Sequence, residues 1–360
     1  MDTQKLDQTY IANTYARFPV TIVKGKGSLV WDDTGKEYID LSTGIAVDIF
    51  GVADEEWMAA VTKQLGTLQH ISNPYYTEPC VKLAQMLCEK TGMKKVFFGN
   101  SGAEANECAI KAARKWSEEK KGKDYSTIIT LKNSFHGRTI TTLAATGQDV
   151  FHHDFTPLTE GFVYAEPNDL ADLERLLAEN KCAAVMMEVV QGEGGVMPLD
   201  EAYVKGAAKL CQENDLLLIC DEVQIGNGRS GMLYGYMTYG VQPDIVSTAK
   251  GLAGGLPLGA TLFSEKTKDV LTPGSHGSTF GGNPICCAGA INILSRLDEK
   301  TLAGVRERSE YIFSELSGAP GIKEVSGLGL MIGIKTEKDA SGCSRHSTFP
   351  WSCSNRQSAL

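Results

Sequence analysis

Three features of the sequence combine residue types and positions that could do chemistry, and the first is a lysine. Lys250 follows the largely β-branched run IVSTA and precedes the glycine-rich stretch GLAGGLPLG. A lysine at a buried strand end is costly unless it is neutral or covalently used, and desolvation lowers the amine pKa as a Schiff-base lysine requires. The alternative for Lys250 alone is a side chain that carries its charge out to solvent.

The second feature is an acid at the end of another apolar run. Asp221 and Glu222 follow LLLIC, and the carboxyl end of such a strand is where open α/β sheets place their ligands. A carboxylate in that position must find a partner, because its desolvation is costly. An ordinary solvated loop acid remains the alternative for Glu222.

The third feature is the start of a helix in the stretch GNSGAEANECAIKAARKW. Ser101 and Glu104 fit a capping box, and Gly99 and Gly102 leave the backbone open ahead of the helix. Free N–H groups and the helix dipole at such a start favour phosphate, with a plain capped helix as the alternative. Small and aromatic residues spaced by four and three predict the face that meets the core: Ala105, Ala109, Ala112 and Trp116.

Taken together, the three features match the needs of pyridoxal 5'-phosphate (PLP). The acid would keep the pyridine nitrogen protonated, the lysine would carry the covalent linkage, and the helix start would hold the phosphate. In SFHGRT, Phe135 could stack on a ring and Arg138 could clamp a substrate carboxylate. In HGSTFGGNP, Thr279 could make a second phosphate contact, whereas His136 and His276 have the alternative of ordinary loop histidines.

Two other kinds of site find little support. The glycines of GNGRSG follow a predicted strand, as in the fingerprint of a dinucleotide-binding site. That fingerprint requires a helix next, but the glycine-punctuated MLYGYMTYG follows instead. It also requires an acid about 20 residues further on to bind the ribose, and Asp244 lies too close to the glycines. No third motif joins the run HHD at residues 152–154, and the cysteines lack zinc spacing. We therefore expect neither a nicotinamide cofactor nor a metal, and we expect the cysteines at 286–287 to be small core residues.

Short apolar runs that alternate with helical patterns are expected to position these residues. Near-continuous apolarity predicts strands buried on both faces of a mostly parallel sheet, and the strand–helix order predicts a doubly wound α/β fold. The expected strands are 96–99, 127–131, 183–190, 216–220, 244–248 and 259–263. The flanks predict two short strands within 20–45, a helix over 291–318 and a strand–turn–strand over 322–335. We expect a large PLP-binding domain over 51–290 and a smaller α+β domain built from residues 1–50 and 291–341.

The composition is that of an ordinary globular protein with an acidic balance. Of the 360 residues 42% are apolar, and 35 basic against 44 acidic residues give a net charge of −9, which argues against nucleic acid or an anionic membrane surface as a partner. No apolar run approaches the ~20 residues that span a bilayer, and MDTQKLDQTY lacks the apolar core of a signal peptide. Ten cysteines without a C-x-x-C pair fit reduced thiols, so we expect a cytoplasmic location.

From about residue 14 to residue 340, the ordered motifs resemble those of the class III, fold-type I aminotransferases. The motifs that carry the resemblance are NTYARFPV, WDDTGKEYIDLSTGIAV, ISNPYYTEP, FGNSGAEANE, FHGRT, VVQGEGGV, DEVQIGNGRSG, TAKGLAGGLPLGA and HGSTFGGNP. The resemblance implies the α/β fold of this family, PLP as the cofactor, small-molecule substrates, and a homodimer with active sites at the subunit interface.

The resemblance also implies roles for the matching residues. Lys250 would bind the cofactor covalently and then move the proton during amino transfer, and Asp221 would pair with the pyridine nitrogen. The other cofactor contacts would be Ser101, Gly102 and Ala103 at the phosphate, Phe135 on the ring face, Gln224 at the ring oxygen and Thr279 at the phosphate of the partner subunit. The substrate contacts would be Arg138 at the distal carboxylate of glutamate or 2-oxoglutarate, Glu193 opposite an arginine for the α-carboxylate, Ser278, and Tyr15 near the substrate entrance.

The implied reaction is transamination, in which N2-acetylornithine gives up its δ-amino group and 2-oxoglutarate becomes glutamate, a step of arginine biosynthesis. Ornithine, 4-aminobutyrate and succinylornithine are alternative amino donors. Residues 342–360 depart from the family, because they hold five serines but no acid and no lysine. We interpret them as a disordered tail from a frame shift or a truncated gene model, with a natural terminus as the alternative. This tail would replace the segment with the α-carboxylate-binding arginine, so a PLP-binding but catalytically impaired protein is a further alternative.

Overall fold

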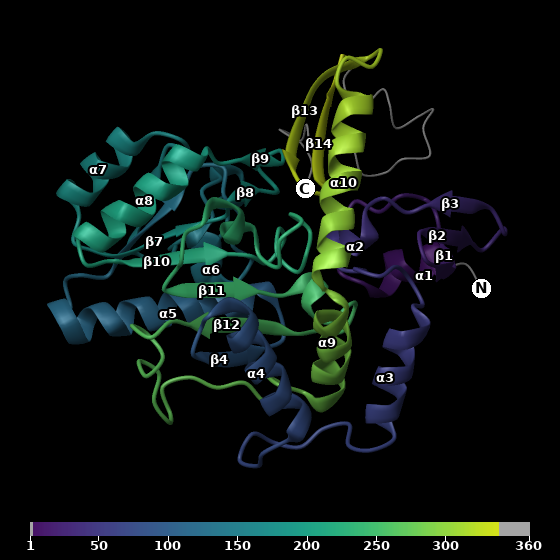
Figure 1. The fold of residues 1–360 in the computed structure, drawn as a ribbon, viewed down its shortest axis with the longest axis horizontal. Helices are drawn as coiled ribbons and strands as arrows, with labels where there is room; N and C mark the ends of the chain where they lie inside the picture. Colours follow the sequence, from purple (N-terminus) through teal and green to yellow (C-terminus); the bar gives the residue numbers. More distant parts are fainter. Residues whose placement is uncertain (1–2, 338–360) are drawn as a thin grey trace.

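The computed structural model describes residues 3–337, and its centre is a seven-stranded sheet (Figure 1). The strand order is β4-β12-β11-β10-β7-β5-β6. Within the described residues β12 runs antiparallel to both of its neighbours, and the other strands of this sheet are parallel to one another. The bounds are β4 Lys95–Gly99, β5 Thr127–Leu131, β6 Phe162–Ala165, β7 Cys182–Met187, β10 Leu217–Asp221, β11 Ile245–Thr248 and β12 Gly259–Phe263. The α/β class and the mostly parallel sheet are therefore as expected.

Three details of this sheet differ from the expectation. The strand β6 was not anticipated; it pairs with β5 and is half-buried over most of its length. The run expected as one strand over 183–190 leaves the sheet after Met187, and β8 (Val190–Gln191) pairs instead with β9 (Met197–Pro198). The direction of β12 could not be foreseen, because a strand buried on both faces has the same apolar pattern whichever way it runs.

Helices cover both faces of the sheet, so its strands bury alternate side chains in two separate cores. In β10, Leu217 and Ile219 pack into the cluster that includes Trp116, whereas Leu218 and Cys220 pack into the larger cluster on the opposite face. The first face is covered by α5 (Gly102–Lys121), whose expected apolar stripe is buried as predicted. The other face carries α4 (Glu78–Thr91), α7 (Leu170–Glu179), α8 (Glu201–Glu213) and α9 (Pro284–Arg296).

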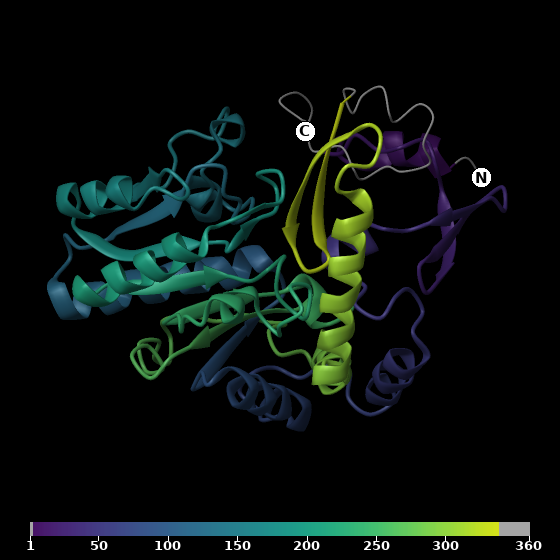
Figure 2. The same cartoon turned by 45° about the horizontal axis from the view of Figure 1, so that its top comes forward.

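The two flanks of the chain lie to one side of the large sheet (Figures 1 and 2). The N-terminal flank forms an antiparallel sheet of three strands rather than two: β1 (Ile22–Lys26), β2 (Leu29–Asp32) and β3 (Glu37–Ile39). The C-terminal flank forms the expected hairpin of β13 (Ile322–Leu328) and β14 (Met331–Thr336) beside α10 (Glu299–Leu316).

The expected single helix over 291–318 is in fact the end of α9 and the whole of α10, separated at residues 297–298. The boundary expected at residue 290 thus falls inside α9, and the division into two domains stays a prediction. The tail expected at 342–360 lies outside the described residues. The remaining helical segments are α1 Thr3–Tyr10, α2 Thr43–Ala46, α3 Glu55–Leu65, α6 Ile140–Ala145, and the short 3-10 turns η1 Asp149–Phe151, η2 Gly235–Tyr239 and η3 Lys250–Leu252.

Candidate active site

The sheet topology brings the three predicted features to one edge. Strands β4, β10 and β11 are parallel, so the residues that follow them meet where these strands end. Asp221 pairs with Ser247 near the end of β11, and Lys250 comes three residues later. The antiparallel β12 begins at this same edge, where Gly259 pairs with Gly99 just ahead of α5. Lys250, Asp221 and the start of α5 therefore lie together at the edge where open α/β sheets bind ligands.

Asp221 is a buried carboxylate with three hydrogen-bond donors. Its side chain is 3% exposed, and its Oδ2 accepts from Asn106 Nδ2 at 2.7 Å and from His136 Nδ1 at 2.8 Å. The backbone N–H of Val223 donates to Oδ1 at 3.0 Å. These three donors satisfy the buried carboxylate oxygens of Asp221 and fix their orientation. Asn106 was missed from the sequence, where its only signal is a polar residue next to the apolar stripe of α5.

His136 is part of this network, so the interpretation of His136 as an ordinary loop histidine is wrong. Burial lowers the pKa of its imidazole, but the hydrogen bond and the charge of Asp221, together with Glu188, raise the pKa above its usual value. Glu188 accepts from the backbone N–H of Phe135 at 2.8 Å. Burial raises the pKa of Glu188 to about 7, although nearby His136 acts in the opposite direction. The expectation of one strand over 183–190 gave no indication that Glu188 accepts this hydrogen bond.

Lys250 stands two residues after β11, at the start of η3, with a backbone φ of +45°. Burial lowers the pKa of its amine, and the negative charges of Glu193, Asp221 and Glu188 oppose that effect only in part. Within residues 3–337, no hydrogen bond from the amine is found. A neutral amine is the nucleophilic form of lysine, so this environment favours covalent use of Lys250.

The start of α5 offers backbone donors, although the expected capping box is only half formed. Ser101 Oγ accepts from the backbone N–H of Glu104 at 3.2 Å. The Glu104 carboxylate accepts from the backbone and side chain of Asn100 instead of from the backbone of Ser101, which corrects the expectation. Among the described residues, the N–H groups of Gly102 and Ala103 make no hydrogen bond. Two free amides at a helix start are suited to an oxyanion.

Gly102 has no room for a side chain, because Val223 in the loop after Asp221 lies close to it. A Cβ at Gly102 would lie 2.6 Å from Val223 Cγ1, which is closer than real Cβ contacts. The next residue, Gln224, is similarly close to Gly192, where a Cβ would overlap Gln224 Oε1. The loop after β10 is therefore in close contact with both the helix start and the segment after β8.

Phe135 and Arg138 follow β5 on the segment that also holds His136. Phe135 is half-buried, and its ring centroid lies 5.9 Å from that of Phe151. The guanidinium of Arg138 is exposed and lies 4.1 Å from the Phe151 centroid and 5.4 Å from that of Phe135. Within residues 3–337, Arg138 has no carboxylate partner, so its donors are available to a substrate.

The other predicted site residues differ in whether they contact the start of α5 or act on Lys250. Ser278 Oγ accepts from Asn100 Nδ2 at 3.1 Å, which places Ser278 beside the start of α5. Glu193 is exposed but acts electrostatically on Lys250. Thr279 is exposed, and Tyr15 is 65% exposed, with its ring below the guanidinium of Arg17. Among the described residues, no hydrogen bond, ion pair or ring contact joins Thr279 or Tyr15 to Asp221, Asn106 or His136.

Glu222, left open as a solvated loop acid, is fully buried, so that alternative is wrong. Its two carboxylate oxygens accept from the N–H groups of Gly235 at 2.6 Å and Tyr236 at 2.8 Å. Burial raises the pKa of Glu222 to about 8. The glycines at 226, 228 and 231 lead through turns into η2 rather than into a long helix, as expected. Glu222 thus anchors the start of η2 through two backbone N–H groups.

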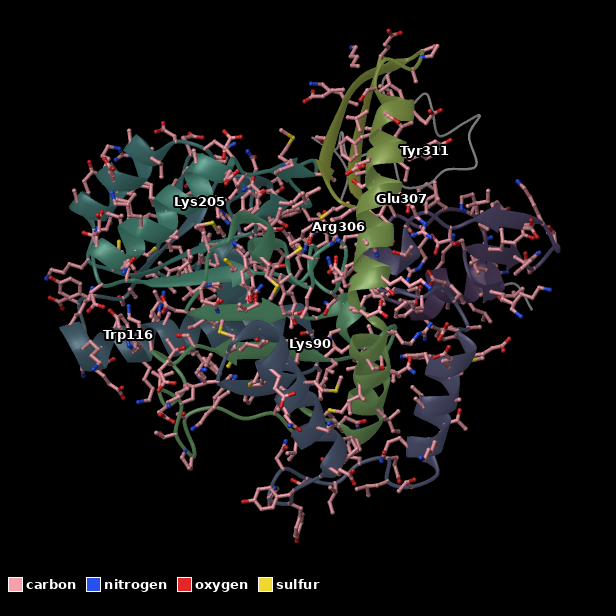
Figure 3. All side chains as sticks on the ribbon, in the orientation of Figure 1. Lys90, Trp116, Lys205, Arg306, Glu307 and Tyr311 are labelled. Carbon is pink, nitrogen blue, oxygen red and sulfur yellow. The ribbon has the colours of Figure 1, made fainter. Side chains whose placement is uncertain are left out.

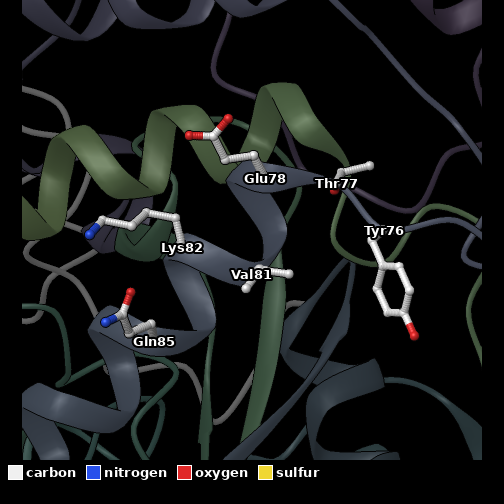
Figure 4. A pocket seen from close by; sticks show the side chains of 6 residues that line it. All are labelled: Tyr76, Thr77, Glu78, Val81, Lys82 and Gln85. Carbon is white, nitrogen blue, oxygen red and sulfur yellow. The ribbon is translucent and has the colours of Figure 1, made fainter.

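Several further features lie apart from the strand edge. A surface hollow over the first turns of α4 is lined by Tyr76, Thr77, Glu78, Val81, Lys82 and Gln85 (Figure 4). Cys286 and Cys287 are buried core residues, as predicted. In the described part of the chain, no cluster of three or more His, Cys, Asp or Glu side chains has a geometry that could hold a metal. None of the helices in that part has the length and apolarity needed to cross a membrane.

Known proteins are similar to this chain in sequence over most of its length. The family model of the class III aminotransferases matches residues 10–348. The acetylornithine aminotransferase of Haemophilus ducreyi is 50% identical over 335 residues, which are 93% of this chain and 85% of that protein. The succinylornithine transaminase of Yersinia pseudotuberculosis is 43% identical over 353 residues, 95% of this chain and 85% of that protein.

Solved structures give the same result. The ornithine aminotransferase of Toxoplasma gondii has a TM-score of 0.88 at 36% identity, over 94% of this chain and 82% of that one. The N-acetylornithine aminotransferase of Stenotrophomonas maltophilia has a TM-score of 0.79 at 37% identity, over 93% and 84%. The chain therefore belongs to the class III aminotransferases. It is an aminotransferase of fold type I that depends on PLP, which a structure of the Toxoplasma enzyme holds at its active site.

The residues at the strand edge fit PLP. The cofactor has a phosphate, a basic ring nitrogen and an aldehyde that reacts with amines. The free amides of Gly102 and Ala103 suit the phosphate, the buried carboxylate of Asp221 suits a protonated ring nitrogen, and the amine of Lys250 suits the aldehyde.

Proposed function

We propose that this chain transfers the δ-amino group of N2-acetylornithine to 2-oxoglutarate, giving N-acetylglutamate 5-semialdehyde and glutamate in arginine biosynthesis. The observation that carries this substrate assignment is the likeness to acetylornithine aminotransferases, six of which are 43–50% identical over 92–94% of the chain. Succinylornithine and ornithine are the nearest alternatives, because transaminases of these names are also similar. A further alternative is 4-aminobutyrate.

The catalytic residues of the proposal are Lys250 and Asp221. PLP, when bound, supplies an electron-withdrawing ring that stabilises negative charge on the substrate carbon. Lys250 would hold the cofactor covalently, and its amine, when free and neutral, would accept the proton that leaves the substrate carbon. Asp221 keeps the ring nitrogen protonated. The three donors on Asp221 and the lowered pKa of Lys250 support these roles.

The remaining cofactor contacts surround these two residues. Ser101, Gly102 and Ala103 bind the phosphate at the start of α5, which the free amides there support. Phe135 lies on the ring face, held through its backbone by Glu188. Gln224, three residues after Asp221, contacts the ring oxygen.

The substrate contacts of the proposal are Arg138, Glu193, Ser278 and Tyr15. Arg138 binds the distal carboxylate of glutamate or 2-oxoglutarate, and the absence of an internal carboxylate partner among the described residues supports this role. Glu193 lies opposite an arginine that binds the α-carboxylate, Ser278 lies beside the start of α5, and Tyr15 lies near the substrate entrance.

We further propose a cytoplasmic homodimer in which Thr279 reaches the phosphate in the partner subunit. The surface around the α4 hollow supports it, because Tyr76 is 99% exposed and Phe280 is 58% exposed. Asn73 Nδ2 donates to two carbonyls of the loop 278–281, at 2.9 and 3.2 Å. A second copy that covers Tyr76 would therefore meet the loop with Thr279.

A substrate panel tests the proposal. Initial rates are measured with 2-oxoglutarate and each of N2-acetylornithine, succinylornithine, ornithine and 4-aminobutyrate, and the glutamate formed is quantified. The proposal expects the highest kcat/KM with N2-acetylornithine. A higher kcat/KM with ornithine or with 4-aminobutyrate would refute the assignment, and sedimentation of the protein as a monomer would refute the dimer.

A further inference from the structure

The glycine-rich loop at residues 226–231 holds a buried amide to which the proposed function gives no role. Asn227 stands between two glycines, is 1% exposed and has a backbone φ of +56°. Asparagine adopts this left-handed conformation more readily than other non-glycine residues. A buried side-chain amide needs partners for its two N–H groups, and those partners show what Asn227 does.

Both amide hydrogens of Asn227 are used on the segment that leads to Lys250. Asn227 Nδ2 donates to Thr248 Oγ1 and to the Ala249 carbonyl, each at 3.1 Å. Thr248 is the last residue of β11, and the Ala249 carbonyl belongs to the peptide group that joins Ala249 to Lys250. Asn227 therefore fixes the orientation of the peptide plane from which Lys250 starts.

The backbone at Ala249 and Lys250 lies beyond the hydrogen bonds of the sheet. The β10–β11 ladder ends at Ser247 and the β11–β12 ladder ends at Thr248, so neither ladder pairs residues 249 and 250. Lys250 then turns into a φ of +45°, which a residue with a side chain seldom adopts. The Ala249 carbonyl also accepts from the N–H of Leu252 at 2.9 Å, so it is held from two sides.

The loop itself is anchored independently of the Asn227 side chain. The Arg306 guanidinium on α10 donates to the Gly231 carbonyl at 2.6 Å, and Figure 3 labels Arg306 on that helix. Arg229 donates to Thr43 Oγ1 at 3.2 Å. Loss of the Asn227 amide should therefore loosen the Ala249–Lys250 peptide, which the N–H of Leu252 alone would then hold, without displacing the loop.

We propose that Asn227 is a positioning residue for Lys250. Its amide holds the Ala249–Lys250 peptide so that the lysine amine stays within reach of the bound cofactor. The inference rests on the proposed role of Lys250 as the covalent partner, and Asn227 acts only through the backbone, without touching substrate or cofactor.

Three variants of the full chain separate positioning from general stability. Asn227→Gly keeps the left-handed φ and removes the amide, whereas Asn227→Asp keeps the shape and replaces the donor by a carboxyl. The matched control is Ser230→Ala, because Ser230 is 5% exposed and its Oγ hydrogen-bonds with Met232 in the same loop. Thermal unfolding of each variant reports on the fold.

The readout is the rate at which the cofactor-free protein captures added PLP covalently, followed by visible absorbance across the pH range in which the fold is stable. Asn227→Gly is expected to capture PLP about three- to tenfold more slowly than the unchanged chain, and Ser230→Ala at the same rate. For Asn227→Asp, the rate relative to the unchanged chain is expected to recover as the pH falls, because the protonated carboxyl can donate to Ala249.

Equal capture rates for Asn227→Gly and the unchanged chain would overturn this inference and leave the proposed function standing. If Asn227→Gly does not fold, the pH dependence of Asn227→Asp decides, and a rate ratio that is flat with pH overturns the inference. Capture by the unchanged chain on a lysine other than Lys250 would instead overturn the proposed site, and the inference with it. Peptide mapping after reduction of the captured protein distinguishes these results.

Discussion

The role of Asn106 gives a prediction that can be worked out from the structure. Its Nδ2 donates to the Asp221 carboxylate at 2.7 Å and to the His136 carbonyl at 2.8 Å. Asn106→Ala removes both bonds inside the protein. A hydrogen bond to a charged group is worth about 1.5–3 kcal/mol and a neutral one about 0.5–1.5 kcal/mol, so we expect the free energy of unfolding to fall by about 2–4 kcal/mol.

The same helix supplies a matched control. Ser117 is fully buried on α5, and its hydroxyl has no hydrogen-bond partner among the described residues. Ser117→Ala removes an unsatisfied polar group, so we expect it to leave the stability unchanged or slightly higher. The assay is equilibrium urea unfolding of both variants and the unchanged chain at one fixed excess of PLP. If Asn106→Ala costs no more than Ser117→Ala, the hydrogen-bond network around Asp221 does not stabilise this site as we argue.

Three further predictions concern other parts of the site. Burial raises the pKa of folded Glu222 to about 8, above its unfolded value, so between these two values the folded state holds a proton that the unfolded state has lost. The free energy of unfolding should therefore fall as the pH rises from about 4.5 to 8, by at most about 1.4 kcal/mol per pH unit. Glu222→Gln should flatten this slope, which urea unfolding at several pH values measures. Gly102→Ala places a Cβ 2.6 Å from Val223 Cγ1 and should weaken PLP binding measured by equilibrium dialysis, whereas Gly277→Ala, where the Cβ meets open space, should not. Arg138→Ala should raise the KM for 2-oxoglutarate by about ten- to a hundredfold, for the loss of about 1.5–3 kcal/mol, and an unchanged KM would place that carboxylate elsewhere.

The parts of the fold that sequence patterns determine were predicted well. The strands β10 and β11, which lead to Asp221 and Lys250, are short and fully buried, so their positions and their shared edge followed from the α/β pattern. The α5 stripe ending at Trp116 followed from helical spacing in the same way. Local spacing is enough for such elements, because burial on a sheet or a helix face dictates the residue types directly.

The parts that depend on pairing between distant residues were not predictable. His136 is separated from Asp221 by 85 positions in the sequence and Asn106 by 115, and nothing in their local sequence marks either contact. Glu222 is an acid after a strand in the sequence, and only the fold shows that the N–H groups of η2 surround it. Glu104 has capping-box spacing, but its carboxylate bonds Asn100, because the chain before the helix turns that residue toward it.

The measurement that tests the central claim most directly is the identity of the lysine that binds PLP. The holoprotein is treated with borohydride, which fixes the cofactor to its lysine, then digested and mapped by mass spectrometry. The account predicts one labelled peptide with the label on Lys250, and no label or visible absorbance band from bound cofactor in Lys250→Ala. A label on a different lysine, or a band that persists in Lys250→Ala, would contradict it.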